Sequence, residues 1–243
     1  LLNLKKSLEN PYFARIDFVS ENGNKSRVYI GKKGIKNDDE IIVTDWRAPI
    51  SSLYYDSEIG QTSYNSPVGI VKGDLQLKRQ YDISNGVLQN YFDVSLVSSD
   101  QLLQDYLNRN NDSRLKSIVS TIQKEQNEVI RMPISENLIV QGVAGSGKTT
   151  VALHRIAYLV YNYINTIKQS EYLVLGPNDV FIKYIKSVLP DLDVSEVKQM
   201  TFEKLAINLI DEKINYILDD SEIDTESTDR EIIWFKNTLE YKK

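Results

Sequence analysis

Residues 142–149, Gly-Val-Ala-Gly-Ser-Gly-Lys-Thr, constrain the fold of this chain more than any other stretch. They fit the phosphate-binding pattern G-x-x-x-x-G-K-[ST] at every fixed position. The glycines let backbone N–H groups approach phosphate oxygens, and a following helix points the positive end of its dipole at the anion. An apolar run at 138–140 precedes the loop, and apolar residues at helical spacing follow it at 150–164. We therefore expect a short buried strand, a turn that binds a nucleoside triphosphate, and a helix.

The motif gives its polar side chains distinct roles. Lys148 would reach the β- and γ-phosphates, and the Thr149 hydroxyl would ligate Mg²⁺. The ordinary alternatives are a solvated lysine at a helix start and a simple helix cap. The expected cofactor-binding residues of the motif are Gly142, Val143, Ala144, Gly145, Ser146, Gly147, Lys148, Thr149 and Thr150. Lys148 and Thr149 are the expected catalytic residues, and Thr149 is also the expected metal ligand.

Composition limits the class of protein. A chain of 243 residues can form one large or two ordinary domains, and 41% hydrophobic residues are typical of a soluble globular protein. The net charge of −5 gives no basic footprint for nucleic acid over the whole chain, although it does not exclude a local basic groove. The absence of cysteine excludes disulfides and Cys-based metal sites. No stretch has the roughly 18 apolar residues of a membrane span, and the chain starts with no signal peptide and no Met. We expect a piece of a cytoplasmic protein that binds no membrane.

Residues 11–97 predict an antiparallel β-rich region, which follows the end of an N-terminal helix at 1–10. Alternating segments flank Asn22-Gly23 and Asn85-Gly86, and Asn-Gly in this position is a strong hairpin signal. The many aromatic residues of this region are expected in strands and core rather than as a base-stacking platform. Further strands are expected at 40–44, 50–55 and 61–64, and the second hairpin joins 75–83 to 87–94.

Residues 98–243 predict strands alternating with helices, which implies right-handed crossovers and a parallel sheet. The expected helices are 101–109, 114–131, 180–189 and 202–218, and the expected strands after the loop are a buried one at 172–175 and a weaker one at 196–200. The acidic stretch at about 219–231 is expected to be an exposed loop, with a further helix starting at 232. The expected fold class is therefore α/β.

A phosphate-loop motor also needs an apolar strand that ends in an acidic pair, which holds Mg²⁺ and orients the attacking water. Asp211-Glu212 lies inside a helical pattern, and Asp219-Asp220 opens a polar run. Neither this second motif (Walker B) nor an arginine finger is evident. We expect this piece to bind a nucleotide without hydrolysing it on its own.

Residues 140–150 resemble motif I of the UvrD/Rep-like superfamily 1 helicases. Residues 121–126, Thr-Ile-Gln-Lys-Glu-Gln, lie where those enzymes carry their Q motif, and this resemblance implies that Gln126 reads the adenine edge of ATP. Gln123 is the alternative candidate, and an exposed helical glutamine is the ordinary interpretation. Residues 175–178 resemble motif Ia, and residues 199–202 resemble the next strand-to-helix element.

Residues 44–55 and 152–159 are similar to the HelD-type proteins of Gram-positive bacteria, which are often labelled DNA helicase IV-like. The resemblance covers nearly the whole chain. It implies an ATP-driven factor that binds RNA polymerase, releases nucleic acid from stalled or post-termination complexes and recycles the enzyme, with ATP and Mg²⁺ as cofactors. It also implies two RecA-like motor domains, a long N-terminal coiled coil and an inserted arm. Residues 98–243 would then be an incomplete RecA-like P-loop domain with a partial parallel sheet and flanking helices.

Two other functions remain open. One is a conventional ATP-dependent 3'-5' DNA helicase or translocase, and the other is a nucleotide-responsive module that binds a protein partner without motor activity. DNA or RNA is a candidate partner in addition to RNA polymerase.

Three further features have an ordinary interpretation beside a functional one. Asp45-Trp46-Arg47 is either a functional element or, as we favour, a strand-end Asp, a packed Trp and an Arg ion pair. Gly176-Pro177-Asn178 is either a loop that faces nucleic acid or a turn with Asn178 as the N-cap of a helix. His154, the single histidine, is expected to pack or to lie at the surface rather than to act in catalysis.

Overall fold

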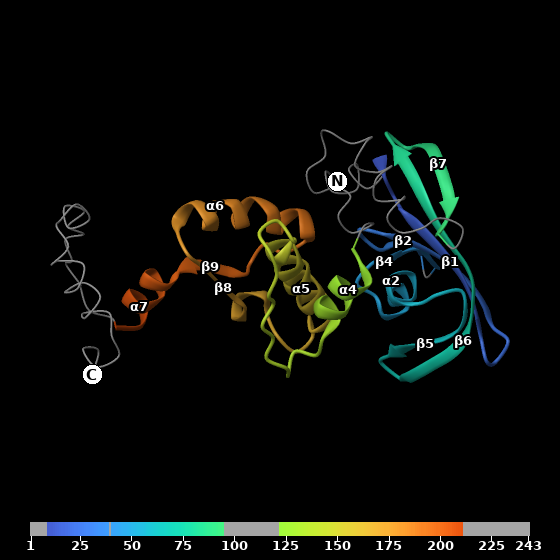
Figure 1. Cartoon of the computed structure of the whole chain (residues 1–243), viewed down its shortest axis with the longest axis horizontal. Coiled ribbons are helices and arrows are strands. Elements are labelled where there is room, and N and C mark those ends of the chain that lie inside the picture. The colour runs from blue at the N-terminus through green and yellow to red at the C-terminus, as the bar shows by residue number, and fades with distance from the viewer. Residues whose placement is uncertain (1–8, 39, 95–121, 211–243) are drawn as a thin grey trace.

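The computed structural model describes residues 9–38, 40–94 and 122–210. A β-rich region lies at one end of the molecule and a phosphate-loop unit at the other, with helices α4 and α5 of this unit nearest the β-rich region (Figure 1). The helices or helical parts predicted at 1–8, 101–109, 114–121 and 211–218, the acidic pairs, the acidic stretch and the helix from 232 lie outside the described residues.

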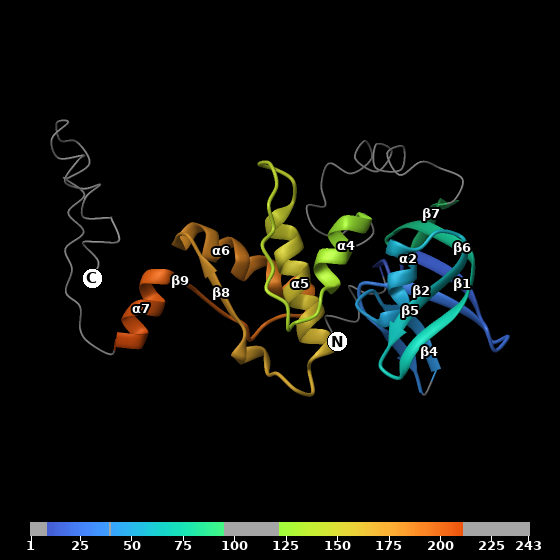
Figure 2. The same ribbon diagram turned by 60° about the horizontal axis from the view of Figure 1, so that its bottom comes forward.

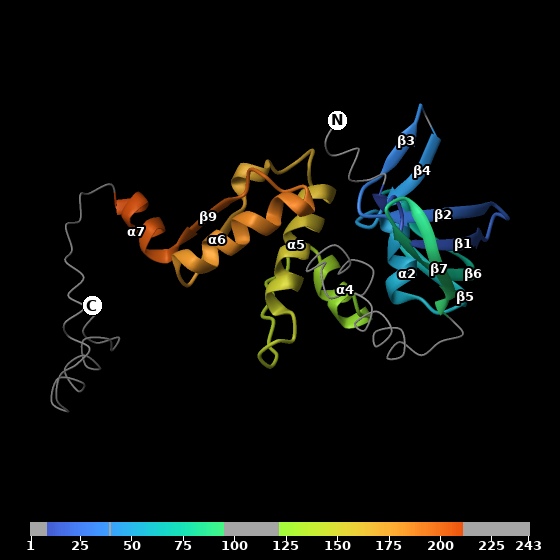
Figure 3. The same ribbon diagram turned by 90° about the horizontal axis from the view of Figure 1, so that it is seen from above.

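The β-rich region is a seven-stranded sheet of order β3-β4-β2-β1-β6-β5, with β7 on the same edge of β6 as β5. All pairs are antiparallel except β2 with β4, so the predicted antiparallel β-rich region is confirmed with one parallel exception. Both Asn-Gly hairpins are confirmed as well. In Figure 3, β3 and β4 stand apart from the other strands. The strands are β1 (Ala14–Ser20), β2 (Lys25–Gly31), β3 (Ile35–Asn37), β4 (Glu40–Asp45), β5 (Gly60–Ser66), β6 (Gly69–Ser84) and β7 (Val87–Asp93).

The strand predicted at 50–55 is wrong. A 3₁₀ turn, Pro49–Ser51, leads directly into helix α2, Ser52–Asp56. Pro49 presets the helical φ angle at the start of the turn, and the Ser51 hydroxyl donates to the Asp45 carbonyl at 2.8 Å. The helix buries Leu53, Tyr54 and Tyr55, three successive residues that a one-sided strand would alternate between core and solvent.

The main core lies between the sheet, α2, α4 and α5. Its aromatic members are core residues, as expected, although only Phe18 lies in a strand: Phe13, Phe18, Trp46, Tyr54 and Tyr55. Ile130 of α4 and Val151 of α5 belong to the same core, so the β-rich region and the phosphate-loop helix bury one shared apolar interior. The remaining fully enclosed members are Ala14, Ile16, Ile30, Leu53, Leu75 and Ile122.

From α5 onward, the phosphate-loop unit confirms the predicted alternation of helices and strands. Strands β8 and β9 pair in parallel, from Leu173 with Lys198 to Gly176 with Thr201. A second core joins α5, through Leu153 and Ala157, to α6 through Ile185. The elements are α4 (Lys124–Arg131), α5 (Lys148–Asn162), β8 (Leu173–Gly176), α6 (Asp179–Val188), β9 (Lys198–Thr201) and α7 (Phe202–Ile210), with 3₁₀ turns at Gln169–Glu171 and Leu189–Leu192.

The buried strand predicted at 138–140 is wrong. These residues form no strand, and Ile139 is 94% exposed. β8 is not buried either, since Leu173 and Leu175 are 41% and 45% exposed. A strand is stabilised by hydrogen bonds to its neighbours, and within the described residues β8 and β9 pair with each other and not with 138–140. The structure is therefore a mixed α/β fold with a short parallel pair beside the antiparallel sheet.

Two helix boundaries differ from the prediction. The helix predicted at 114–131 begins, in its described part, at Lys124, because Gln123 has the extended backbone of an N-cap, with φ −74° and ψ 160°. The helix predicted at 150–164 runs from Lys148 to Asn162. Lys148 and Thr149 therefore lie in the first turn of α5 rather than in the loop before it.

Candidate nucleotide-binding site

The phosphate-loop motif is an exposed turn at the N-terminus of α5 (Figure 2). The N–H of Ser146 donates to the carbonyl of Val143 at 3.2 Å, which closes the turn. Gly145 and Gly147 have φ angles of 84° and 79°. This left-handed conformation costs glycine nothing and strains other residues, so the turn requires the two glycines of the motif.

The start of α5 has the features that a phosphate group requires. The first N–H groups of an α-helix have no partner inside the helix, and no side chain caps α5. The positive end of the helix dipole lies at the same place. A Cβ on Gly145 would meet no other atom within 4 Å, so open space adjoins the turn. These features fit the nucleotide phosphates that the sequence predicted at this loop.

The Lys148 side chain folds back over the turn. Its Nζ donates to the carbonyls of Gly142 and Val143 at 2.8 and 2.7 Å. The ammonium is thus held at the loop by neutral acceptors, which an anionic oxygen would replace favourably because charge-assisted hydrogen bonds are stronger. Thr149 and Thr150 follow in the first turn of α5 and are half-buried.

Gln126, on α4, lies beside the phosphate loop. A Cβ on Gly147 would lie 3.6 Å from Gln126 Nε2, so the side-chain amide adjoins the residue that starts α5. Gln126 Oε1 accepts a hydrogen bond from the N–H of Gln123 at 3.2 Å, which orients the amide. Gln123 itself is the exposed N-cap of α4. Of the two glutamines that the sequence left open, Gln126 is therefore the one whose amide is shown to adjoin the loop.

Asp45-Trp46-Arg47 has the structural role that the sequence favoured, a strand-end Asp, a packed Trp and an Arg ion pair. Arg47 binds both carboxylate oxygens of Asp45, with Nε and Nη2 at 2.8 and 2.7 Å, and both side chains are buried. Burial alone would lower the pKa of Arg47, but the ion pair with Asp45 outweighs burial and the pKa is raised. Trp46 is buried in the core, as predicted.

The sequence did not reveal that this tripeptide joins the two regions. Arg47 Nη1 donates to the carbonyl of Leu192 at 3.1 Å, and the guanidinium lies 4.7 Å from the ring centre of Tyr161 at the end of α5. Asp193 contacts Arg47 at 3.5 Å and also pairs with Lys33 of the β-rich region. These partners are distant along the chain, so no local pattern could have predicted them.

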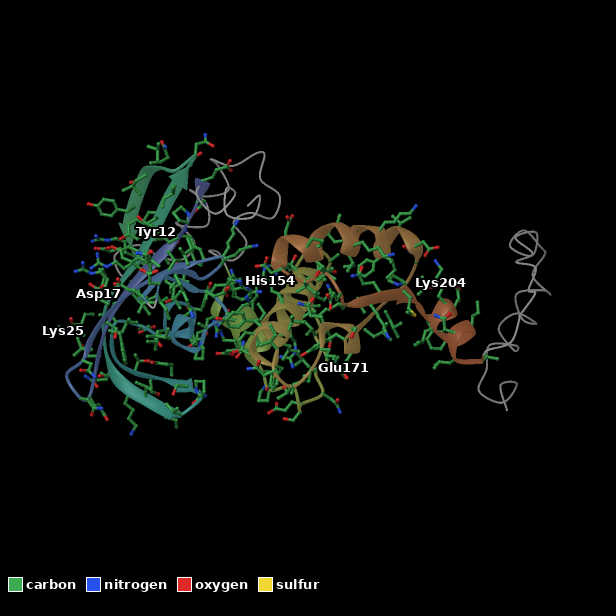
Figure 4. The ribbon with its side chains drawn as sticks, turned by 180° about the vertical axis from the view of Figure 1, so that it is seen from behind. Tyr12, Asp17, Lys25, His154, Glu171 and Lys204 are labelled. Atoms are coloured by element: carbon green, nitrogen blue, oxygen red, sulfur yellow. The ribbon has the colours of Figure 1, made fainter. Side chains whose placement is uncertain are left out.

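His154 is a packing residue, as expected. It is 2% exposed, and its ring lies 5.6 Å from that of Trp46, where the β-rich region meets α5 (Figure 4). Its Nδ1 donates to the Thr150 carbonyl at 2.7 Å, and its buried Nε2 has no partner among the described residues. Burial lowers the pKa of His154, so the ring is neutral at pH 7.

Asn178 is the N-cap of α6, which confirms the structural interpretation of Gly176-Pro177-Asn178. Its Oδ1 accepts a hydrogen bond from the N–H of Phe181 at 2.9 Å. Among the described residues, no group of three or more His, Cys, Asp or Glu could hold a metal ion. None of the helices in the described ranges is long and apolar enough to cross a membrane.

Comparison with protein families adds to this geometry. Residues 1–112 match the N-terminal domain of DNA helicase IV HelD, and residues 122–238 match the N-terminal domain of UvrD/REP helicases. The first match contains the β-rich sheet, and the second contains Gln126 and the phosphate loop. The chain belongs to the HelD/UvrD-like superfamily 1 helicases. For this family, the UvrD-type domain indicates ATPase or helicase activity in full-length members, which generally use ATP and Mg²⁺. No curated protein matches the chain.

Proposed function

We propose that this chain is the ATP-binding part of a superfamily 1 helicase-like motor that binds RNA polymerase. ATP hydrolysis by the full-length cytoplasmic protein would release nucleic acid and recycle the polymerase. The observation that carries the proposal is the position of the Gln126 amide beside Gly147, at the loop that begins α5. A phosphate cradle and a base-reading amide are then adjacent, as an adenine nucleotide requires.

Each residue of the site has a role in this proposal. Lys148 Nζ exchanges the carbonyls of Gly142 and Val143 for phosphate oxygens, and the backbone N–H groups of residues 143–150 surround the same oxygens. The Thr149 hydroxyl holds Mg²⁺, and Gln126 reads the adenine edge. ATP supplies the phosphoanhydride bond whose hydrolysis drives the motor.

The domain proposal follows from the same resemblance. Residues 1–10 end an N-terminal helix, residues 11–97 form the β-rich domain, and residues 98–243 form an incomplete RecA-like domain. The acidic pairs Asp211-Glu212 and Asp219-Asp220 lie outside the described residues. We propose that this piece binds ATP but does not hydrolyse it on its own.

Two alternatives compete with this function. A conventional 3'-5' DNA helicase would share the site, but the match of residues 1–112 to the HelD N-terminal domain favours the polymerase-associated motor. A nucleotide-responsive protein-binding module without motor activity is supported by one observation. The β-rich region shares its core with α4 and α5, so nucleotide binding at the loop could affect the β-rich region through packed side chains.

Nucleotide binding is tested by titrating the chain with a fluorescent ATP analogue and Mg²⁺. Hydrogen bonds from a charged donor contribute about 1.5–3 kcal/mol, so Lys148→Ala should weaken binding roughly 10- to 150-fold. Lys204→Ala is the matched control, because Lys204 is an exposed lysine on α7 that pairs with Asp179. Equal affinity of Lys148→Ala and the unchanged chain would contradict the site.

The partner is tested with the full-length protein. Co-purification with RNA polymerase, with ATP-dependent release of bound nucleic acid, is expected. ATP-dependent duplex unwinding without polymerase binding would favour the conventional helicase. The non-motor module would be favoured if the Lys148→Ala variant still binds polymerase and if neither the full-length protein nor this variant hydrolyses ATP.

A further inference from the structure

Besides the shared core, one arginine of α5 binds the end of helix α4. Arg155 lies on α5, seven residues after Lys148, so the two side chains leave nearly the same face of the helix two turns apart. Its guanidinium binds the end of α4. Nη1 donates to the carbonyls of Val129, Ile130 and Met132 at 3.0, 3.2 and 2.7 Å, and Nη2 donates to the carbonyl of Pro133 at 3.1 Å.

These four carbonyls explain why an arginine is needed. The last C=O groups of an α-helix have no partner inside the helix, and a cation near them also interacts favourably with the negative end of the helix dipole. The planar guanidinium can donate in several directions at once, which an ammonium on a flexible stem cannot do with the same geometry. Arg155 is therefore the C-terminal cap of α4, supplied by another helix.

The other side of α4 is fixed to the β-rich region. Arg131 Nη2 and Nη1 donate to the carbonyls of Trp46 and Ala48 at 2.6 and 3.3 Å, and Nε donates to Asn127 Oδ1 at 3.0 Å. Asn127 Nδ2 in turn donates to Asp56 Oδ1 at 2.6 Å. Core contacts and the stacking of Arg131 on Tyr158 also join α4 to α5, and Arg155 adds the hydrogen bonds that fix the end of α4 to the helix that carries Lys148.

Gln126 lies on the same eight-residue helix, less than two turns before the end that Arg155 caps. A helix this short moves as a rigid body, so a shift at its C-terminus moves the Gln126 amide relative to Gly147. The phosphate contacts have a different origin, because the turn and Lys148 belong to α5 itself. Loss of the cap should therefore affect the base end of the site and leave the phosphate end in place.

We propose that Arg155 is a positioning residue for base recognition, which holds Gln126 at the distance from the phosphate loop that selects adenine over guanine. The proposal rests on the proposed function, because it assumes that Gln126 reads the base. Arg155 needs no contact with the nucleotide, and its role is to set where the reading amide lies.

The test is the affinity of the full chain for Mg·ATP, Mg·GTP and inorganic tripolyphosphate. Arg155→Met removes the four hydrogen bonds and keeps the apolar stem. It should lower the ratio of ATP to GTP affinity about tenfold, the weight of one lost hydrogen bond to the base. Tripolyphosphate affinity should change less than about twofold, because the loop and Lys148 are unchanged.

Four further variants make the result specific. Arg27→Met is the matched control, an arginine whose side chain is 63% exposed in the β-rich region, and it should leave the ratio unchanged. Gln126→Ala should lower the ratio as Arg155→Met does, and the double variant should lose no more than either single one. Arg155→Lys keeps a cation at the helix end without the planar guanidinium, so its ratio of ATP to GTP affinity should be intermediate. If Arg155→Met does not fold, Arg155→Lys provides the test.

An unchanged ratio in both Arg155 variants would overturn the positioning role. Equal losses of ATP, GTP and tripolyphosphate affinity would overturn it too, because a general defect of the fold predicts that pattern. These outcomes differ from failure of the proposed function, in which the unchanged chain binds none of the three probes or binds ATP and GTP equally.

Discussion

The two regions of this molecule enclose their sheets to different degrees. In the β-rich region, hairpins bring neighbouring strands together, and α2 covers the sheet so that Ile16, Leu53 and Leu75 are fully buried. In the phosphate-loop unit, the parallel pair β8-β9 leaves Leu173 and Leu175 half-exposed. The first region encloses its core, with help from α4 and α5, and the second presents apolar strand residues that its described part does not cover. Core substitutions should therefore cost much more in the first region than on the open face of the second.

The largest effect is expected where the two regions meet. Arg47→Met leaves the buried Asp45 carboxylate without its guanidinium, and breaking a buried pair in this way costs about 3–5 kcal/mol. The loss is measured as the change in the free energy of unfolding by urea. Arg27→Met, at an exposed arginine, should cost less than about 0.5 kcal/mol. A cost for Arg47→Met as small as this control would mean that the two regions are not joined through Asp45-Trp46-Arg47.

The comparison of cores is tested by the same truncation in each region. Leu53→Ala removes a fully buried side chain and should cost about 2–5 kcal/mol. Leu175→Ala removes a half-exposed side chain and should cost less than about 1 kcal/mol. Urea unfolding of both variants measures the difference. Similar costs would show that the face of β8 is covered in solution, which would remove the contrast between the regions.

A smaller effect is expected at the start of α6. Asn178→Ala removes the N-cap and should cost about 1 kcal/mol, while Asn178→Ser keeps an acceptor and should cost a few tenths. Thermal unfolding of the two variants gives the difference. If Asn178→Ala leaves stability unchanged and instead weakens single-stranded DNA binding by the full-length protein, the loop of residues 176–178 serves nucleic acid rather than the fold.

The smallest effect is expected from pH. His154 is buried and neutral with a lowered pKa, so the unfolded chain binds a proton more readily than the folded one below the ordinary histidine pKa of about 6.5. Stability should therefore fall as pH drops below about 6.5 and should not depend on this group above that pH. His154→Gln should reduce this slope between about pH 7 and 5.5, as measured by urea unfolding at each pH. Identical slopes would show that folding does not lower the pKa of His154.

Local signals predicted much of this fold. The Asn-Gly hairpins, the phosphate-loop turn and the order of elements after it each depend on residues that are close in the sequence. The strand prediction at 138–140 was wrong because a strand depends on neighbours that no local pattern contains. The prediction at 50–55 was wrong because Pro49 and the Ser51 hydroxyl start a helical turn in a segment whose apolar residues also suit a strand.

The candidate site was predictable from a contiguous motif and a family resemblance. The loop is a contiguous motif, and the resemblance to the Q motif supplied Gln126, whereas the sequence alone did not choose between Gln126 and Gln123. Arg155 was missed because a charged residue on an amphipathic helix usually faces solvent. One physical signal points to Arg155: the last carbonyls of a helix need donors. Arg131, the last residue of α4, does not supply them, because it binds the β-rich region.

Amide hydrogen exchange of the chain, with and without Mg·ATP, tests the central claim most directly. ATP held by the loop and read by Gln126 should slow exchange in residues 142–150 and in α4, Lys124–Arg131, because both segments contact the nucleotide. Exchange in β5 and β7, far from the loop, should not change. Unchanged exchange at 142–150, or protection confined to the β-rich sheet, would contradict the assignment of the nucleotide site.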